Sequence, residues 1–237
     1  MFHPARLLLI ATAMVCSGAA RAEDGPDFKL TLGRYGSSDG NPAWDVNLRA
    51  SQGPITGWIG AYRDHAGLQQ WRSGLERHFD SDSLRGLLSL QSASGGVWVG
   101  SASAEIGGAS YAIVGFGRTN VRNYINLNYD PNDAITLGLG TRAIEHTELS
   151  LFTVHDDRLH TRQEVTHLVL RRRFDGEQRL TIDLFAKRGL TGDGTFISSR
   201  SWTLGYDRGP LFVRFSHDPN AGFTAPTQNR FSFGTRF

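Results

Sequence analysis

The sequence has little sulfur, little lysine and no long apolar run. Its 237 residues include one Cys, two Met and two Lys, the latter at Lys29 and Lys187. A single Cys excludes a fold held by disulfides within the chain. A helical membrane protein is excluded because no segment reaches the roughly 18 apolar residues of a transmembrane helix. A membrane β-barrel stays open, because alternating strands give a mild mean hydropathy, here −0.31.

The first 22 residues have the three parts of a secretory signal peptide. Arg6 supplies the positive charge, residues 7–15 form a short apolar segment, and Ala20-Arg21-Ala22 is a small-x-small cleavage site. Cleavage after Ala22 removes the Cys, both Met and two Arg, so the net charge falls from +2 to zero. Of the 23 remaining cationic residues, 21 are Arg. This bias favours planar recognition of anions or ion pairing over general solubility.

From residue 23 onward the pattern is one of short alternating strands separated by turns. Trp44, Val46 and Leu48 alternate with Asp45 and Asn47, which is the period of a sheet with one apolar and one polar face. No linker divides the chain, so residues 23–237 are predicted to form one all-β domain. A soluble β-sandwich would show the same spacing. The candidate strands are 27–36, 43–51, 55–63, 68–79, 84–93, 97–105, 109–117, 123–129, 134–142, 147–155, 163–173, 179–187, 197–206, 211–217 and 229–237.

The C-terminal strand favours the membrane barrel. It places Phe231, Phe233 and Phe237 on one face and ends the chain on Phe. In this it resembles bacterial outer-membrane β-barrel proteins of the porin type, whose last strand carries alternating aromatics as an assembly signal. The resemblance implies a Gram-negative outer membrane, with its lipid and lipopolysaccharide as surroundings and the barrel-assembly machinery as a partner. Trp and Tyr residues near predicted strand ends are typical of the aromatic girdles of such barrels.

Bacterial barrels have an even number of strands, whereas the sequence pattern gives fifteen candidate strands. We predict an antiparallel transmembrane barrel of fourteen strands, with twelve as the alternative. The surplus is either the segment 27–36 or a strand split in two around 105–129. Counting back from the C-terminus predicts extracellular loops at 156–162, 188–196 and 218–228. It also predicts periplasmic turns, at DRGP (207–210), DGEQ (175–178), 143–146, SGG (94–96) and DHAG (64–67).

The polar faces of the strands then point into the lumen. Exposure of a charge to lipid costs about 2–4 kcal/mol at the midplane, so this assignment follows from energetics. The clearer strands place nine cations inside against three anions. This excess predicts a small channel that favours anions; the alternative is a closed barrel whose arginines pair with acids. The inward residues are Lys29, Arg49, Arg72, Arg142, Arg171, Arg179, Lys187, Arg214 and Arg236, with Asp45, Glu76 and Asp183.

Histidines and carboxylates concentrate at predicted extracellular loops. The residues are His155, Asp156, Asp157 and His160, with His217 and Asp218 on a second loop. A His beside a carboxylate acts as a general base in many enzymes, so an outer-membrane protease or lipid hydrolase is an alternative function. With His167, the spacing also allows transient metal binding. A solvated polar rim is the favoured interpretation, and we expect no catalytic residue, resident metal or cofactor.

A polar segment around Tyr124 is rich in Asn, and its amides either line a sugar path or fill the bore. It contains Asn120, Asn123, Asn126 and Asn128, and filling is the favoured interpretation. The arginines are spread over many strands instead of forming a basic patch, so no nucleic-acid partner is expected. Small anionic solutes are the predicted cargo of the channel.

Overall fold

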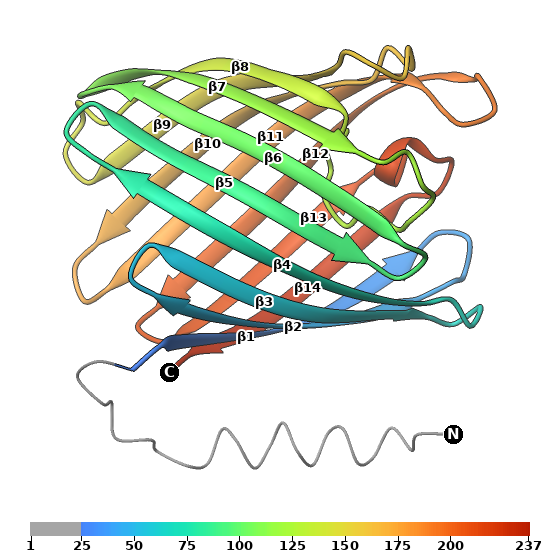
Figure 1. Ribbon diagram of the computed structural model, residues 1–237, viewed down its shortest axis with the longest axis horizontal. Coiled ribbons are helices and arrows are strands. Elements are labelled where there is room, and N and C mark those ends of the chain that lie inside the picture. Colours follow the sequence, from blue (N-terminus) through green and yellow to red (C-terminus); the bar gives the residue numbers. More distant parts are fainter. Residues whose placement is uncertain (1–24) are drawn as a thin grey trace.

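The chain forms a closed antiparallel β-barrel of fourteen strands, so the predicted strand number is confirmed (Figure 1). The structure is a computed structural model that describes residues 25–237. The predicted leader, with cleavage after Ala22, lies outside the described residues. The strands are β1 Asp27–Ser37, β2 Ala43–Gln52, β3 Ile55–Asp64, β4 Gln69–Asp80, β5 Leu84–Ala93, β6 Val97–Gly107, β7 Ser110–Thr119, β8 Ala134–Thr141, β9 Thr147–Asp156, β10 Glu164–Phe174, β11 Gln178–Leu190, β12 Phe196–Arg208, β13 Leu211–Asp218 and β14 Gln228–Arg236.

Alternation along each strand sorts apolar side chains outward and polar side chains inward. On β8, Leu137 and Leu139 are 61% and 70% exposed on the outer surface. On β11 the outward Leu184 is half exposed, whereas its neighbour Phe185 and the charged Lys187 are buried inside. This distribution inverts that of a soluble protein, in which large apolar side chains fill the core. An apolar outer surface around a polar interior is the arrangement that a lipid bilayer requires.

The barrel closes where the first and last strands pair. β1 pairs with β14 from Lys29↔Arg236 to Ser37↔Gln228, and the C-terminus lies beside the start of β1 (Figure 1). The end of the barrel that holds the start of β1 and the C-terminus has the shorter connections, and we call it the short-turn end. Its turns are 53–54, 81–83, 108–109, 142–146, 175–177 and 209–210. The opposite, long-loop end has the connections 38–42, 65–68, 94–96, 120–133, 157–163, 191–195 and 219–227.

Two details of the predicted strand order were wrong. The segment 27–36, one of the two explanations for the surplus candidate, is the full strand β1. The surplus lies in the other named region, around 105–129, but it is not a split strand: the predicted strand 123–129 is part of the connection between β7 and β8. Consequently DHAG and SGG lie at the long-loop end, opposite DRGP and DGEQ. The segment 123–129 imitates a strand because Ile125 and Leu127 both pack against the inner wall of the barrel, which produces the same period of two.

The connection between β13 and β14 also folds over the long-loop end. It contains a short 3-10 helix, η1 (Ala221–Phe223), in which Phe223 is buried against Val165 and Phe185. Lys187 Nζ donates a hydrogen bond to the Asn220 carbonyl oxygen at 3.1 Å. Within residues 25–237 the structure contains no helix that is long and apolar enough to cross a membrane.

A glycine on β14 lies at the pairing of β1 with β14, which is called the barrel seam below, and its replacement should destabilise the fold. An added Cβ at Gly234 would collide with the Phe212 ring and the Leu30 carbonyl oxygen. Because one of these atoms belongs to the backbone of the paired strand β1, relaxation is limited. We expect Gly234→Ala to lower the free energy of unfolding by about 1–3 kcal/mol, measured by urea titration of the refolded barrel. Gly100→Ala is the control, because no atom lies within 4 Å of its added Cβ; equal stability of both variants would contradict the prediction.

Candidate functional site

The connection 120–133 crosses the lumen, where side chains from β4, β10 and β14 hold it. Gln70 on β4 bonds the Ile125 backbone twice, accepting from its N–H at 2.7 Å and donating to its carbonyl oxygen at 2.9 Å. Arg230 on β14 donates to the Leu127 carbonyl oxygen at 2.5 Å. The strands that anchor this loop, β7 and β8, stand seven strands away from β14 and β1 around the barrel. The loop therefore spans the lumen from one side to the other.

Apolar contacts reinforce these bonds. Ile125 and Leu127 pack against a buried cluster on the inner wall. Further along, the Tyr129 ring lies 4.8 Å from the Phe185 ring on β11. Because extended backbone alternates its side chains, the loop presents apolar groups to the wall and polar groups to the remaining space. The wall cluster under Ile125 and Leu127 consists of Tyr35, Ala43 and Tyr62.

A buried carboxylate fixes the base of the connection 120–133, which is called the inward loop below. Asp133 accepts hydrogen bonds from the Thr119 backbone N–H at 3.2 Å and from the Thr119 hydroxyl at 2.6 Å. Arg158 donates to the same carboxylate at 2.8 Å. Residues 119 and 133 flank the loop, so these bonds join its two ends and fix the direction in which it leaves the wall.

His167 on β10 connects the loop to the wall through two carboxylates. Its Nε2 lies 2.8 Å from Asp130 in the loop, and its Nδ1 lies 3.0 and 3.1 Å from the two oxygens of Asp183 on β11. The ring is 3% exposed and stacks between Phe152 and Phe185. Only the imidazolium form donates from both nitrogens. The arrangement is therefore a charged bridge that holds the loop at Asp130.

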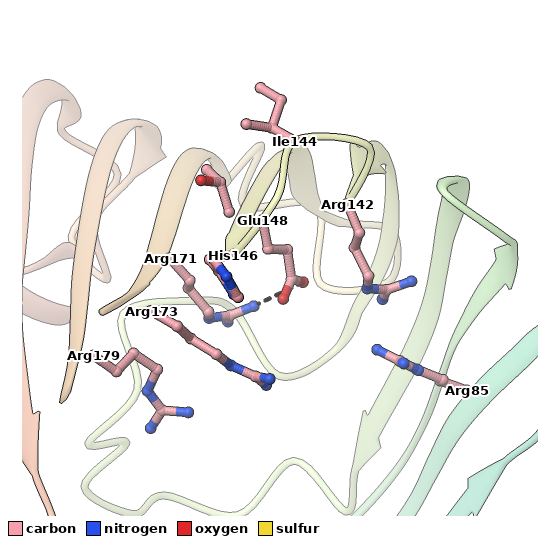
Figure 2. Close-up of a pocket in the computed structure, with 9 residues that line it drawn as sticks. Arg85, Arg142, Ile144, His146, Glu148, Arg171, Arg173 and Arg179 are labelled. Atoms are coloured by element: carbon pink, nitrogen blue, oxygen red, sulfur yellow. Dashed lines mark hydrogen bonds and ion pairs between the residues drawn. The ribbon is translucent and has the colours of Figure 1, made fainter. Parts of the chain in front are cut away.

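A cavity of about 410 Å³ opens at the short-turn end and is rich in arginine. Figure 2 shows its arginines pointing into one space around a single carboxylate, Glu148, which pairs with Arg171 at 3.1 Å. A second cavity, of about 460 Å³, shares part of this lining and extends the space to Phe152, beside His167. The arginines of the first cavity, called the arginine vestibule below, are Arg85, Arg142, Arg171, Arg173 and Arg179.

The cavity at the long-loop end has the opposite character. It measures about 320 Å³ and is lined by the inward loop, by Asp39, Asp64 and Asp218, and by one cation, Arg230. Hydrogen bonds from Ser37 and from the Asn41 backbone hold the pKa of Asp39 below its ordinary value, so it stays an anion. The two ends share no lining residue. Because Asp218 pairs with Lys187, the mouth at the long-loop end has a small excess of negative charge, from Asp39 and Asp64 against Arg230, whereas arginine dominates the vestibule.

Most of the predicted lumen cations form ion pairs. Arg49 on β2 pairs with Glu76 on β4, and Arg72 on β4 pairs with Asp45 on β2. Strands two apart approach each other only on the concave side of the wall, so these pairs lie inside. The other pairs are Arg142–Glu105, Arg171–Glu148, Arg179–Asp207, Arg236–Asp207 and Lys187–Asp218. Arg214 forms no such pair in the described part of the chain, and Asp183 faces His167.

The sequence prediction missed the lumen acids Glu105, Glu148 and Asp207, and it also missed the inward cations Arg85, Arg173 and Arg230. The signal was present: Glu105 shares its strand face with Ser101 and Ser103, and Asp207 shares its face with Thr203. Both acids lie within a few residues of a turn, where the end of a strand is difficult to place from sequence. The sequence pattern does not bring Asp130 and Asp183 together at His167, because the inward loop has the alternation of a strand.

The predicted rim residues do not assemble into one site. His155 lies on the outer face, with Nδ1 3.5 Å from Glu164, and His217 bonds Asn229 on the same face. Asp156 is buried and accepts the backbone N–H groups of 158, 159 and 161, so it organises its own loop. His167 points inward, so it cannot share a metal ion with His155. Over residues 25–237 no three His, Cys, Asp or Glu side chains are placed to hold a metal.

Asp157, Asp218 and His160, the other residues of the predicted rim set, also lie outside any shared site. Asp157 receives two hydrogen bonds from Arg118, at 2.8 and 2.6 Å. Asp218 is buried with Lys187 and accepts from the Ser201 hydroxyl at 2.6 Å. His160 has a positive φ of 56° in an exposed loop. None of these carboxylates is paired with a histidine of the predicted set.

These features define a closed, fourteen-stranded antiparallel β-barrel with an inward loop and a charged lumen. The outer-membrane protein Omp33 of Acinetobacter baumannii has a similar fold, with a TM-score of 0.58 and 10% identity over 91% of this chain and 100% of that one. A mutant of the Rh. blastica porin matches with a TM-score of 0.48 and 9% identity over 90% and 99% of the two chains. No family model matches the sequence. No curated protein sequence matches it either.

Proposed function

We propose that this protein is an outer-membrane diffusion channel that favours small anions. The observation that carries the proposal is the arginine vestibule, in which five arginines line one cavity. Four of them pair with carboxylates, as Arg85–Asp80, Arg142–Glu105, Arg171–Glu148 and Arg179–Asp207. Arg173 has no ion pair among the described residues, so its charge is free to act on solutes. Arginine clusters within low-dielectric walls raise the local concentration of anions. Their planar donors also match carboxylate and phosphate groups.

The outer surface supports the proposed location. Large apolar side chains are exposed on the strands, and the C-terminal strand β14 presents Phe231 and Phe233 outward on the same surface. We place the short-turn end in the periplasm and the long-loop end outside the cell, because bacterial barrels have short periplasmic turns. The proposed partners are lipopolysaccharide at the outer leaflet and the barrel-assembly machinery during insertion. Cleavage of the leader after Ala22 is part of the same proposal.

The experiment is a planar bilayer measurement with a salt gradient. We expect the wild-type barrel to give a reversal potential of anion-selective sign, and Arg173→Gln/Arg179→Gln to move it towards zero. The physical reason is that two vestibule charges are removed, one of them unpaired and the other bonded to Asp207. Arg188→Gln is the control, because Arg188 lies on the outer face and pairs with Glu164.

A cation-selective reversal potential would contradict the anion preference, and absence of conductance in a correctly folded barrel would contradict the channel. Folding is checked by different gel migration of boiled and unboiled samples. The hydrolase alternative has its own signature, namely lipid or peptide cleavage that His155→Ala or Asp157→Ala abolishes. The separation of His155 from the buried carboxylates does not support that alternative.

A further inference from the structure

Three cations stand directly opposite one another on adjacent strands at the barrel seam. Lys29 on β1 is the cross-strand partner of Arg49 on β2 and of Arg236 on β14. Like charges in directly opposite positions destabilise a sheet. All three belong to the inward set and are partly exposed to the lumen. Negative charge on the lumen side would relieve the repulsion among these three cations.

The same cations gather around one buried ring. The Phe212 ring centroid lies 4.8 Å from Lys29 Nζ, 5.0 Å from Arg236 Cζ and 5.4 Å from Arg214 Cζ. Phe212 is 2% exposed, so it forms the floor of the cluster. A ring face attracts cations but carries no net charge. The ring therefore positions the three cationic groups without neutralising them.

The nearby carboxylates are too few for these cations. Glu76 is bound by Arg49, and Asp207 is shared between Arg179 and Arg236. The side chains of Lys29 and Arg214 form no hydrogen bond or ion pair with any of residues 25–237. Arg179 Nε, beside Asp207, is also buried without a hydrogen-bond partner. Arg214 is exposed to the lumen and Lys29 is partly exposed, so an anion in the lumen can reach this cluster and supply the missing negative charge.

We propose that Lys29, Arg214 and Arg236 form a binding site for a phosphate-type oxyanion. This deepens the proposed anion-channel function, on which its role in transport rests. The planar Arg guanidinium groups donate paired hydrogen bonds to tetrahedral oxyanions, and the Lys ammonium adds a compact point charge. Two cations without carboxylates favour a doubly charged ligand over chloride. The shared chemistry is the phosphate group, either free or carried on a small solute.

The test is calorimetric titration of the intact barrel in detergent with inorganic phosphate. We expect saturable binding to the wild type, weakened about tenfold or more in Lys29→Gln and in Arg214→Gln, because each variant removes a charge-assisted hydrogen bond. Lys29→Arg keeps the charge and should retain binding. Arg188→Gln is the matched control, because it neutralises an arginine on the outer face of the barrel that pairs with Glu164. Glucose 6-phosphate and glucose, as further probes, distinguish free phosphate from a phosphorylated solute.

Absence of phosphate binding to the wild type would overturn the site, as would equal weakening by Arg188→Gln and Arg214→Gln. Arg214→Gln and Lys29→Arg keep the proposal testable if Lys29→Gln does not fold. The two proposals fail separately. Anion-selective current without phosphate binding leaves the channel and removes the site, whereas binding without current leaves the site and removes the channel.

Discussion

Replacement of residues 122–131 by a short Gly-Ser linker is expected to raise the single-channel conductance several-fold. The inward loop crosses the lumen, and three wall residues hold it there: Gln70, His167 and Arg230. Conductance depends on the narrowest part of the path, and this loop separates the cavities at the two ends. The measurement is single-channel recording in a planar bilayer at fixed salt.

Smaller changes to the loop contacts give a graded comparison. His167→Gln keeps a polar side chain but removes the imidazolium bridge between Asp130 and Asp183, so we expect a smaller rise in conductance with more current noise. Replacement of residues 192–194, at the tip of an exposed loop, is the control and should leave the conductance unchanged. If removal of the inward loop has no greater effect than this control, the loop is not the constriction.

Lys187→Met is expected to be the most destabilising single substitution described here. The Lys187 and Asp218 side chains form an ion pair and are 0% and 2% exposed. Removal of one partner leaves a buried carboxylate uncompensated, which costs about 3–5 kcal/mol. Lys187 also bonds Asn220, next to η1, so the cap over the long-loop end loses an attachment. Urea titration of the refolded barrel measures the loss.

A double substitution separates the charge from the packing. Lys187→Met/Asp218→Leu removes both charges, so it should recover much of the stability that the single variant loses. The neighbouring surface pair Arg188–Glu164 is the control, because Arg188 is 64% exposed in its side chain and exposed pairs contribute about 1 kcal/mol or less. Equal losses in Lys187→Met and Arg188→Met would refute a special role for the buried pair.

The structure combines the two alternatives that the sequence left open for the lumen arginines. One group is paired, as in a closed barrel, with Arg49–Glu76 and Arg72–Asp45 as examples. Another group has few or no carboxylate partners, with Arg173 in the vestibule and Arg214 at the Phe212 cluster. Paired arginines stabilise the wall, whereas unpaired arginines make the electrostatic potential of the lumen positive. Substitutions aimed at selectivity therefore belong to the second group.

The amino-acid sequence by itself determined the all-β class and the inward or outward face of most strand residues. These properties follow from local alternation, because successive side chains of a strand point to opposite faces. Strand β11 illustrates this: the alternation of Leu180, Ile182 and Leu184 with Thr181 and Asp183 already assigns both of its faces. The alternating aromatics of the last strand come from the same local signal.

Only the tertiary structure decided which inward residues meet and where the segment 120–133 lies. The bonds of Gln70 to Ile125 and of Arg230 to Leu127 join residues 55 and 103 positions apart. Such contacts exist only once β1 pairs with β14 and the wall encloses a lumen. An extended loop packed against that wall has the same period as a strand, so local pattern could not distinguish them. The barrel's closure, a non-local event, made this loop the candidate constriction.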